Sequence, residues 1–267
     1  MPLIQVDGRK VYYESHGASA GTPLVLVMGM GGSCKGWLPL QVPEFSQQYR
    51  TLIYDNRGVG QSEDPGEPFT TADLADDLAG LLRALGITHA HVLGAFLGGM
   101  TAQQFALRHP DLLGRLVLVG TYARPDAKRR LLLEKWREMA RSGVSPGIFV
   151  RERLLWTLQD ETLEQADLID AMSASFPGEG ATASGDLLAR QCDACLTHDT
   201  LDQLRNIPHR TLVVCGRNDQ LTPPKLHREL ADELPNARLA TLYGAHLVMA
   251  EAAQQLNQTV LHFLAER

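Results

Sequence analysis

The fold of this chain is decided by the stretch His91-Val92-Leu93-Gly94-Ala95-Phe96-Leu97-Gly98-Gly99-Met100. Its apolar first half is typical of a short buried strand, and residues 97–108 are typical of a helix that ends before His109-Pro110. Glycines on both sides of Phe96 allow the backbone to turn tightly between the two elements. The sequence therefore predicts a strand, a sharp turn with Phe96 at its tip, and a helix.

The rest of the chain alternates short apolar runs with helical patterns. Apolar runs bounded by turn residues predict strands at residues 3–6, 11–14, 23–28, 51–54, 91–93, 116–119, 211–215 and 238–242. Helices are expected between the later runs; one starts at a capping box formed by Thr70 and Asp73 and stops at Gly86, and the last covers about 252–265. This succession predicts an α/β fold, with a mostly parallel sheet, right-handed crossovers and flanking helices.

One long segment interrupts this alternation. Strand signals vanish between residues 124 and 205, where apolar residues keep helical spacings that are broken by Gly143, Pro146 and a turn at Pro177-Gly178. We interpret residues 124–205 as a helical cap, inserted into a core that consists of residues 1–123 and 206–267.

Composition narrows the class of protein and its partners. The chain has 267 residues, of which 44% are hydrophobic and 21% charged, and its net charge is −6, so no nucleic-acid partner is expected. No leader of signal-peptide type and no apolar run of about 20 residues is present, which predicts a cytoplasmic protein without a membrane partner. The four cysteines are expected to be thiols.

A metal site is not expected. Cys192, Cys195 and His198 have the spacing of metal ligands, but no second pair of ligands follows at zinc-finger distance. One face of a helix explains the spacing better. No cofactor is needed by any of the functions considered below.

Several motifs in the right order resemble the α/β-hydrolase superfamily, and within it the cap-bearing esterases and lactonases of the 3-oxoadipate enol-lactonase type. The resemblance covers nearly the whole chain. The motifs are the stretch around Phe96, Asp55-Asn56-Arg57-Gly58-Val59-Gly60-Gln61-Ser62, Gly98-Gly99-Met100-Thr101-Ala102-Gln103, Cys215-Gly216-Arg217-Asn218-Asp219 with Thr222-Pro223, and Gly244-Ala245-His246-Leu247.

The resemblance assigns roles to individual residues. The turn at Phe96 matches the Gly-x-Ser-x-Gly nucleophile elbow, with phenylalanine at the serine position of the catalytic triad. Asp219 matches the acid that orients the imidazole, and His246, about 27 residues later, matches the general base. The backbone amides of Met30 and Leu97 match the oxyanion hole.

The resemblance also leaves weaker assignments and one more departure. The segment Met28-Gly29-Met30-Gly31-Gly32-Ser33 matches the start of the loop that supplies the oxyanion amide, which we call the oxyanion loop, and Met28 stands where the family usually has histidine. Gly29, Trp37 and Trp156 are candidates to line the substrate pocket. Residues 55–62 are expected to shape the neighbouring loop. Histidines that match no motif are expected on the surface: His16, His109, His209, His227 and His262.

Phe96 leaves the present activity open, because a phenyl ring has neither a lone pair to attack with nor a proton to give. The residue is consistent with natural divergence or with a laboratory substitution. The main prediction is a hydrolase of small carboxylic esters or enol-lactones that lacks its nucleophile and is weakly active or inactive. The alternatives are a non-hydrolytic His-Asp acid/base enzyme (a lyase, isomerase, cyclase or cofactor-free oxygenase) and a catalytically dead protein that binds a small molecule.

Two further points stay open. Ser33 and Cys34 lie on the oxyanion loop and are the candidates for a substitute nucleophile, although helix capping and burial explain them as well. The expected partner is a small carbonyl compound, and the oligomeric state does not follow from the sequence.

Overall fold

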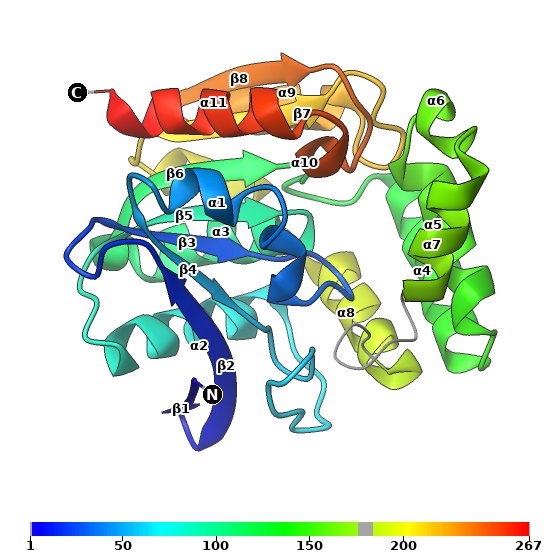
Figure 1. The fold of residues 1–267 in the computed structure, drawn as a ribbon, viewed down its shortest axis with the longest axis horizontal. Coiled ribbons are helices and arrows are strands. Elements are labelled where there is room, and N and C mark those ends of the chain that lie inside the picture. The colour runs from blue at the N-terminus through cyan, green and yellow to red at the C-terminus, as the bar shows by residue number, and fades with distance from the viewer. Residues whose placement is uncertain (1, 176–183, 267) are drawn as a thin grey trace.

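A computed structural model describes residues 2–175 and 184–266 of the chain. One eight-stranded sheet, in the order β1-β2-β4-β3-β5-β6-β7-β8, runs through its centre (Figure 1). The strands are β1 (Leu3–Val6), β2 (Arg9–His16), β3 (Pro23–Val27), β4 (Arg50–Tyr54), β5 (Ala90–Ala95), β6 (Leu113–Val119), β7 (Thr211–Gly216) and β8 (Ala237–Leu242). β1 and β2 pair antiparallel, as do β2 and β4, and the later pairs are parallel.

The helices follow the predicted pattern. They are α1 (Val42–Phe45), α2 (Thr71–Ala84), α3 (Leu97–Arg108), α4 (Ala127–Arg141), α5 (Pro146–Thr157), α6 (Asp160–Leu163), α7 (Ala166–Ser175), α8 (Gly185–Thr197), α9 (Pro224–Glu233), α10 (Val248–Glu251) and α11 (Ala253–Ala265). Short 3-10 helices occupy Cys34–Trp37, Pro110–Leu112 and Leu201–Asn206. The predicted α/β fold with a mostly parallel sheet is confirmed.

Local sequence signals explain where several elements begin and end. The Thr70 hydroxyl accepts a hydrogen bond from the amide of Asp73, and the Asp73 carboxylate accepts one from the amide of Thr70, so the predicted capping box starts α2. Gly86, with a φ of 68°, ends the helix. Most strands extend one to three residues beyond their apolar runs, because ladder pairing continues into residues such as Leu113, which pairs with Ala90.

Two apolar layers hold helices against the faces of the sheet. α2, α3 and α9 pack on one face, where Phe105, Leu78 and Leu230 are buried, whereas α1 and α11 cover the other face, where Phe45 and Val260 are buried. Such burial of large side chains stabilises a fold by about 1.5–3 kcal/mol for each residue.

Between β6 and β7, the described residues form no strand. Helices α4 to α8 fill this segment and lie beyond the carboxyl ends of the central strands (Figure 1). We call residues 127–197 the helical insert. Its buried side chains pack against the start of α3: Leu133, Trp136 and Leu188 belong to one apolar cluster with Leu97 and Met100. The turn predicted at Pro177-Gly178 lies outside the described residues.

No helix in the described part of the chain is long and apolar enough to cross a membrane.

The turn between β5 and α3 leaves no room for side chains beside Phe96. A Cβ at Gly98 would lie 2.1 Å from the carbonyl oxygen of Val27, and a Cβ at Gly94 would lie 2.1 Å from that of Gly98. A backbone carbonyl cannot rotate away from an added methyl group as a flexible side chain can. The glycines are therefore required by close backbone approach, which ties α3 to β3 and β5.

This packing predicts a large loss of stability for Gly98→Ala. The added methyl group must displace the carbonyl of Val27, so we expect the free energy of unfolding to fall by at least ~2 kcal/mol. Gly147→Ala in α5 is the matched control, because no heavy atom lies within 4 Å of its Cβ position. Urea unfolding of both variants measures the difference, and a Gly98→Ala protein as stable as the control contradicts the prediction.

Candidate active site

Phe96 lies at the tip of the turn between β5 and α3 and has a positive φ. Its φ is 60° and its ψ is −119°, one of two positive φ values at non-glycine residues in the described chain. Its amide donates to the carbonyl of Val119 at 2.9 Å, and its own carbonyl accepts from Gly99 at 3.0 Å. A bulky residue in this region costs about 1–3 kcal/mol. The surrounding hydrogen bonds and glycine contacts hold it there.

The Phe96 ring fills a slot between two backbone walls and an imidazole. Cβ atoms at Gly29 and Gly120 would lie 2.5 and 2.8 Å from ring carbons, so both walls admit the ring only because they lack side chains. The ring stacks on His246 with centroids 4.2 Å apart and an interplanar angle of 28°. The phenyl group therefore occupies the space directly beside the imidazole.

Asp219 and His246 come together at the carboxyl ends of two neighbouring parallel strands. Asp219 follows β7, His246 follows β8, and both side chains are buried. The Nδ1 atom of His246 lies 2.9 Å from Oδ2 of Asp219. Because a carboxylate only accepts hydrogen bonds, Nδ1 carries the proton and Nε2 keeps its lone pair in the neutral imidazole.

Thr222 completes the surroundings of the carboxylate. Its amide donates to Oδ1 of Asp219 and its hydroxyl to Oδ2, each at 2.7 Å. Burial by itself raises the pKa of a carboxyl group, but the attraction to the imidazole of His246 when it is protonated, the hydrogen bond from His246 and the donors of Thr222 outweigh this effect. The pKa of Asp219 therefore lies below its usual value, and the group stays ionised beside the imidazole.

Two backbone donors matched to the oxyanion hole are free. The amides of Met30 and Leu97 donate no hydrogen bond to any acceptor among the described residues, and both residues line the same cavity. Leu97 is the first residue of α3, where a helix leaves its amides without internal partners. Both amides are thus available to an oxygen atom of a ligand.

Two side chains of the helical insert bind the oxyanion loop at one peptide group, the one between Met30 and Gly31. Gln191 of α8 accepts a hydrogen bond from the amide of Gly31 at 2.8 Å, and Arg153 of α5 donates to the carbonyl of Met30 at 2.9 Å. This carbonyl and this amide belong to the same peptide bond. Because the peptide group is planar, fixing both of its ends fixes the orientation of the loop.

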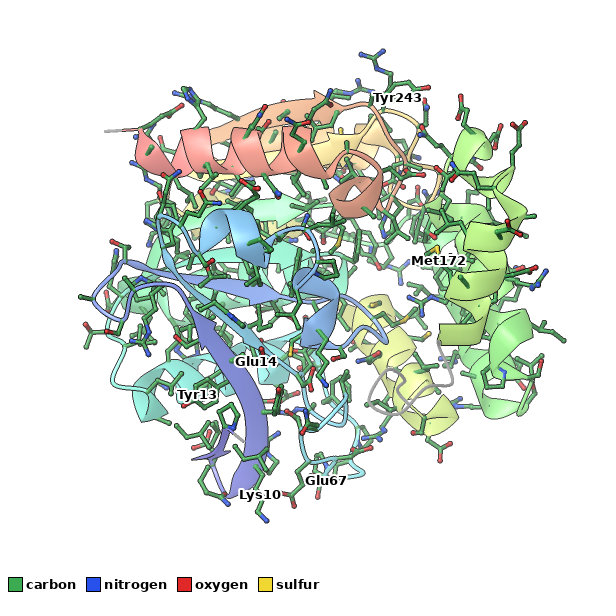
Figure 2. The ribbon with its side chains drawn as sticks, viewed as in Figure 1. Lys10, Tyr13, Glu14, Glu67, Met172 and Tyr243 are labelled. Atoms are coloured by element: carbon green, nitrogen blue, oxygen red, sulfur yellow. The ribbon has the colours of Figure 1, made fainter. Side chains whose placement is uncertain are left out.

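The cavity lies between the strand ends and the insert and has a volume of about 120 Å³. Met172 of α7, labelled in Figure 2, lies on the side of the insert that faces the core and lines this cavity. The core contributes Met30, Phe96, Leu97, Met100, Gly120, Tyr122, Leu221, Thr222, His246 and Leu247, and the insert contributes Arg129, Leu133, Trp136, Val150, Arg153, Leu154, Thr157, Met172 and Cys195.

Two of the expected pocket aromatics lie elsewhere. Trp37 is completely buried in the apolar layer under α11, and it lies away from the cavity because its short helix packs against the sheet. Trp156 donates to Glu152, the Lys128 ammonium lies over its ring at 4.8 Å, and the side chain does not line the cavity. The aromatic side chain of the insert that lines the cavity is Trp136. Gly29 lies behind the Phe96 ring.

Two other expected features have structural explanations. Asp55 accepts hydrogen bonds from the amides of Cys34 and Gln61, which gives residues 55–62 the loop-shaping role expected of them. Ser33 caps the 3-10 helix Cys34–Trp37, and Cys34 is completely buried, which raises the pKa of its thiol. Neither Ser33 nor Cys34 lines the cavity.

Cys192, Cys195 and His198 do not form a metal centre in the described residues. The two thiols are buried in α8, and His198 binds the Thr71 hydroxyl at 2.9 Å. No group of three or more histidine, cysteine or acidic side chains in residues 2–175 and 184–266 is arranged to hold a metal ion.

The prediction that His227 lies on the surface is wrong. Its side chain is completely buried in α9, because the apolar face of that helix turns toward the sheet behind Asp219. Burial lowers the pKa of His227 to about 4, although the charge of Asp219 acts in the opposite direction. The sequence offered no motif for this histidine, and only the periodicity of α9 could have placed it inside.

His227 makes stability depend on pH. The pKa of His227 falls from 6.5 in the unfolded chain to about 4 in the folded protein. The contribution of the neutral side chain to the free energy of unfolding is therefore complete above pH 6.5 and is lost as the pH falls toward 4. On acidification we expect the parent to lose roughly 3 kcal/mol more of its free energy of unfolding than His227→Leu does. Urea unfolding of parent and variant between pH 7.5 and 4.5 measures this effect. The difference between the two free energies of unfolding cancels the contributions of other buried histidines. A pH-independent difference contradicts the assignment.

The fold and the site define an α/β hydrolase. The family model described as alpha/beta hydrolase fold matches residues 22–253, and the chain therefore belongs to this family.

Relatives within the family carry several names. A Mycobacterium tuberculosis (strain H37Rv) protein provisionally named non-heme bromoperoxidase BpoC is 34% identical over 257 residues, which cover 95% of this chain and 97% of that protein. A Caulobacter sp. (strain K31) protein provisionally named carbamate hydrolase RutD is 32% identical, covering 97% of each. The crystal structure of the enol-lactonase from Burkholderia xenovorans LB400 is similar with a TM-score of 0.91 and 28% identity, covering 99% of this chain and 100% of that one.

Proposed function

We propose that this protein binds a small ester, lactone or related carbonyl compound in the cavity and hydrolyses it weakly or not at all. The observation that carries the proposal is the Phe96 ring, which lies in the elbow conformation and stacks on His246 at 4.2 Å. A phenyl ring cannot form the acyl-enzyme bond that a serine hydroxyl forms. The ligand therefore meets a base, an acid and two backbone donors, but no nucleophile.

The surroundings of the cavity support a carbonyl ligand. The free amides of Met30 and Leu97 suit an oxygen atom that carries partial negative charge. The apolar lining suits a small hydrophobic body. Relatives named for the hydrolysis of a lactone and of a carbamate support the same class of compound.

Acid–base catalysis by His246 is the second candidate. Its Nε2 atom has no hydrogen-bond partner among the described residues, and the ring lines the cavity, while Nδ1 is bound to the ionised Asp219. Such an imidazole can take a proton from a bound molecule without any covalent step. This favours a non-hydrolytic lyase, isomerase, cyclase or cofactor-free oxygenase over a protein that only binds.

We further propose that residues 124–205, which comprise the helical insert and its flanking residues, form a cap over a core of residues 1–123 and 206–267. The apolar cluster that joins Trp136 and Leu188 to Leu97 supports this division. The four cysteines are buried free thiols, which supports a reducing compartment such as the cytoplasm.

Restoring the nucleophile tests the hydrolase proposal. We expect Phe96→Ser to raise kcat/KM for p-nitrophenyl esters and enol-lactones by at least ~10², because base, acid and oxyanion donors remain in place. Steady-state rates on a panel of such substrates measure the gain. Two controls separate the effect of the hydroxyl from the effect of a larger cavity. Phe96→Ala enlarges the cavity without adding a hydroxyl, and Phe96→Ser/His246→Ala removes the base.

A Phe96→Ser protein that is folded but no faster than Phe96→Ala on every substrate contradicts the hydrolase proposal. A gain that survives in Phe96→Ser/His246→Ala contradicts the role of His246 as the base.

Proton exchange tests the acid–base candidate. In deuterated buffer we expect the parent protein to accelerate deuterium uptake next to the carbonyl of cyclopentanone, because Nε2 of His246 can accept that proton in the cavity. General-base catalysis contributes about 10²–10⁴-fold, so His246→Ala should lose that factor. Proton NMR follows the exchange. Equal rates for parent and His246→Ala leave binding as the function.

A further inference from the structure

Arg153 brings a positive charge to the cavity without a carboxylate to balance it. Its Nη2 atom donates to the carbonyl of Met30 at 2.9 Å, but its Nε atom is buried without a partner. Arg153 forms no ion pair within the described residues, and the cavity lining contains no aspartate or glutamate. The guanidinium therefore faces an otherwise largely apolar space.

The other arginine of the cavity shows the contrast. Arg129 of α4 binds Asp126 at 2.7 Å and the carbonyl of Leu221 at 3.0 Å, so it already has an anionic partner, which it shares with Lys225. Arg151, two residues before Arg153 on the same helix, points outward and pairs with Asp170 at 2.7 Å. Arg153 is thus less exposed than Arg151, and it differs from both arginines in the lack of an anionic partner.

An unbalanced charge in an apolar site is unfavourable unless an anion or several hydrogen bonds compensate it. One carbonyl oxygen supplies only part of this compensation. Burial lowers the pKa of Arg153, in keeping with poor solvation of the charged form. Guanidinium stays charged at neutral pH, and its planar fork binds a carboxylate through two hydrogen bonds.

We propose that Arg153 binds the carboxylate of the ligand, so that the cavity takes a small monocarboxylate with a short apolar chain. This inference rests on the proposed ligand site in the same cavity and names the class of its ligand. The apolar wall of Leu133, Trp136 and Leu154 receives the chain. The volume of about 120 Å³ is slightly below the roughly 150 Å³ of an apolar cavity that binds benzene, which limits the chain to a few carbon atoms.

The attachment of Arg153 to the oxyanion loop places this carboxylate subsite beside the free amide of Met30. A ligand that holds its carboxylate at Arg153 can direct a second polar group toward the amides and His246. The subsite thereby orients the ligand, which a largely apolar wall alone does not do.

Binding of pentanoate and pentanamide to the parent protein tests the subsite, because the two compounds have nearly the same shape and differ in charge. NMR titration gives both dissociation constants. We expect pentanoate to bind at least ~10-fold more tightly, a typical difference for a charge-assisted hydrogen-bonded pair. Acetate, which has the carboxylate without the chain, should bind more weakly than pentanoate.

Variants assign the preference to Arg153. Arg153→Met keeps an unbranched apolar stem but removes the guanidinium, and it should bring the affinity for pentanoate to that for pentanamide. Arg151→Met removes one charge from the exposed side of the same helix and should keep the preference. Arg153→Lys retains the charge and should keep most of it, which provides a readout if Arg153→Met does not fold.

The outcomes separate this inference from the proposed function. Equal affinities for pentanoate and pentanamide in the parent overturn the carboxylate subsite and leave the cavity as a ligand site. A preference that survives in Arg153→Met also overturns it. The kinetic test with Phe96→Ser does not depend on these compounds, so the proposed function stands or falls separately.

Discussion

The structure depends on the close backbone contact between β5, the start of α3 and the end of β3. The carbonyl of Val27 lies where any side chain on Gly98 would have to be, and Gly94 faces the carbonyl of Gly98 in the same way. This contact fixes the strand–turn–helix unit in one arrangement. As a result the residue at the turn takes a positive φ whatever its side chain is, and Phe96 tolerates a conformation that costs a bulky residue about 1–3 kcal/mol.

The same constraint decides where the Phe96 ring goes. Since the turn directs the side chain at the cavity, the ring can only lie between Gly29 and Gly120, with the imidazole of His246 as its third neighbour. Aromatic stacking of this kind contributes about 0.5–1.5 kcal/mol and offsets part of the backbone strain. The phenyl ring thus makes a packing contact with His246, while Asp219 and His246 remain hydrogen-bonded.

The sequence predicted the features that depend on short stretches of chain. The strands, the capping box of α2 and the turn at Phe96 follow from local patterns, and the strand order brings Asp219 and His246 together at the carboxyl ends of β7 and β8. The side chains that the insert directs at the cavity are harder to predict, because α5 carries apolar residues on more than one side. Ile148 and Leu155 are exposed, whereas Val150 and Leu154 are buried. Such a helix does not indicate which face turns inward, so the sequence points to Trp156 and gives no signal for Arg153. Trp136 of α4 and Gln191 of α8 match no motif, so no local pattern indicates that they lie at the site.

Arg153 and Gln191 show why an insert of this kind matters for a site that the core provides. The free amide of Met30 belongs to a glycine-rich loop that the sheet alone does not hold, and the two side chains bind opposite ends of the next peptide group. Any motion of α5 or α8 therefore acts on the same loop that presents the amide. The orientation of the donor beside Phe96 depends on residues more than 120 positions away in the sequence, and this long-range dependence explains why motifs of the core locate the site but do not identify its ligand.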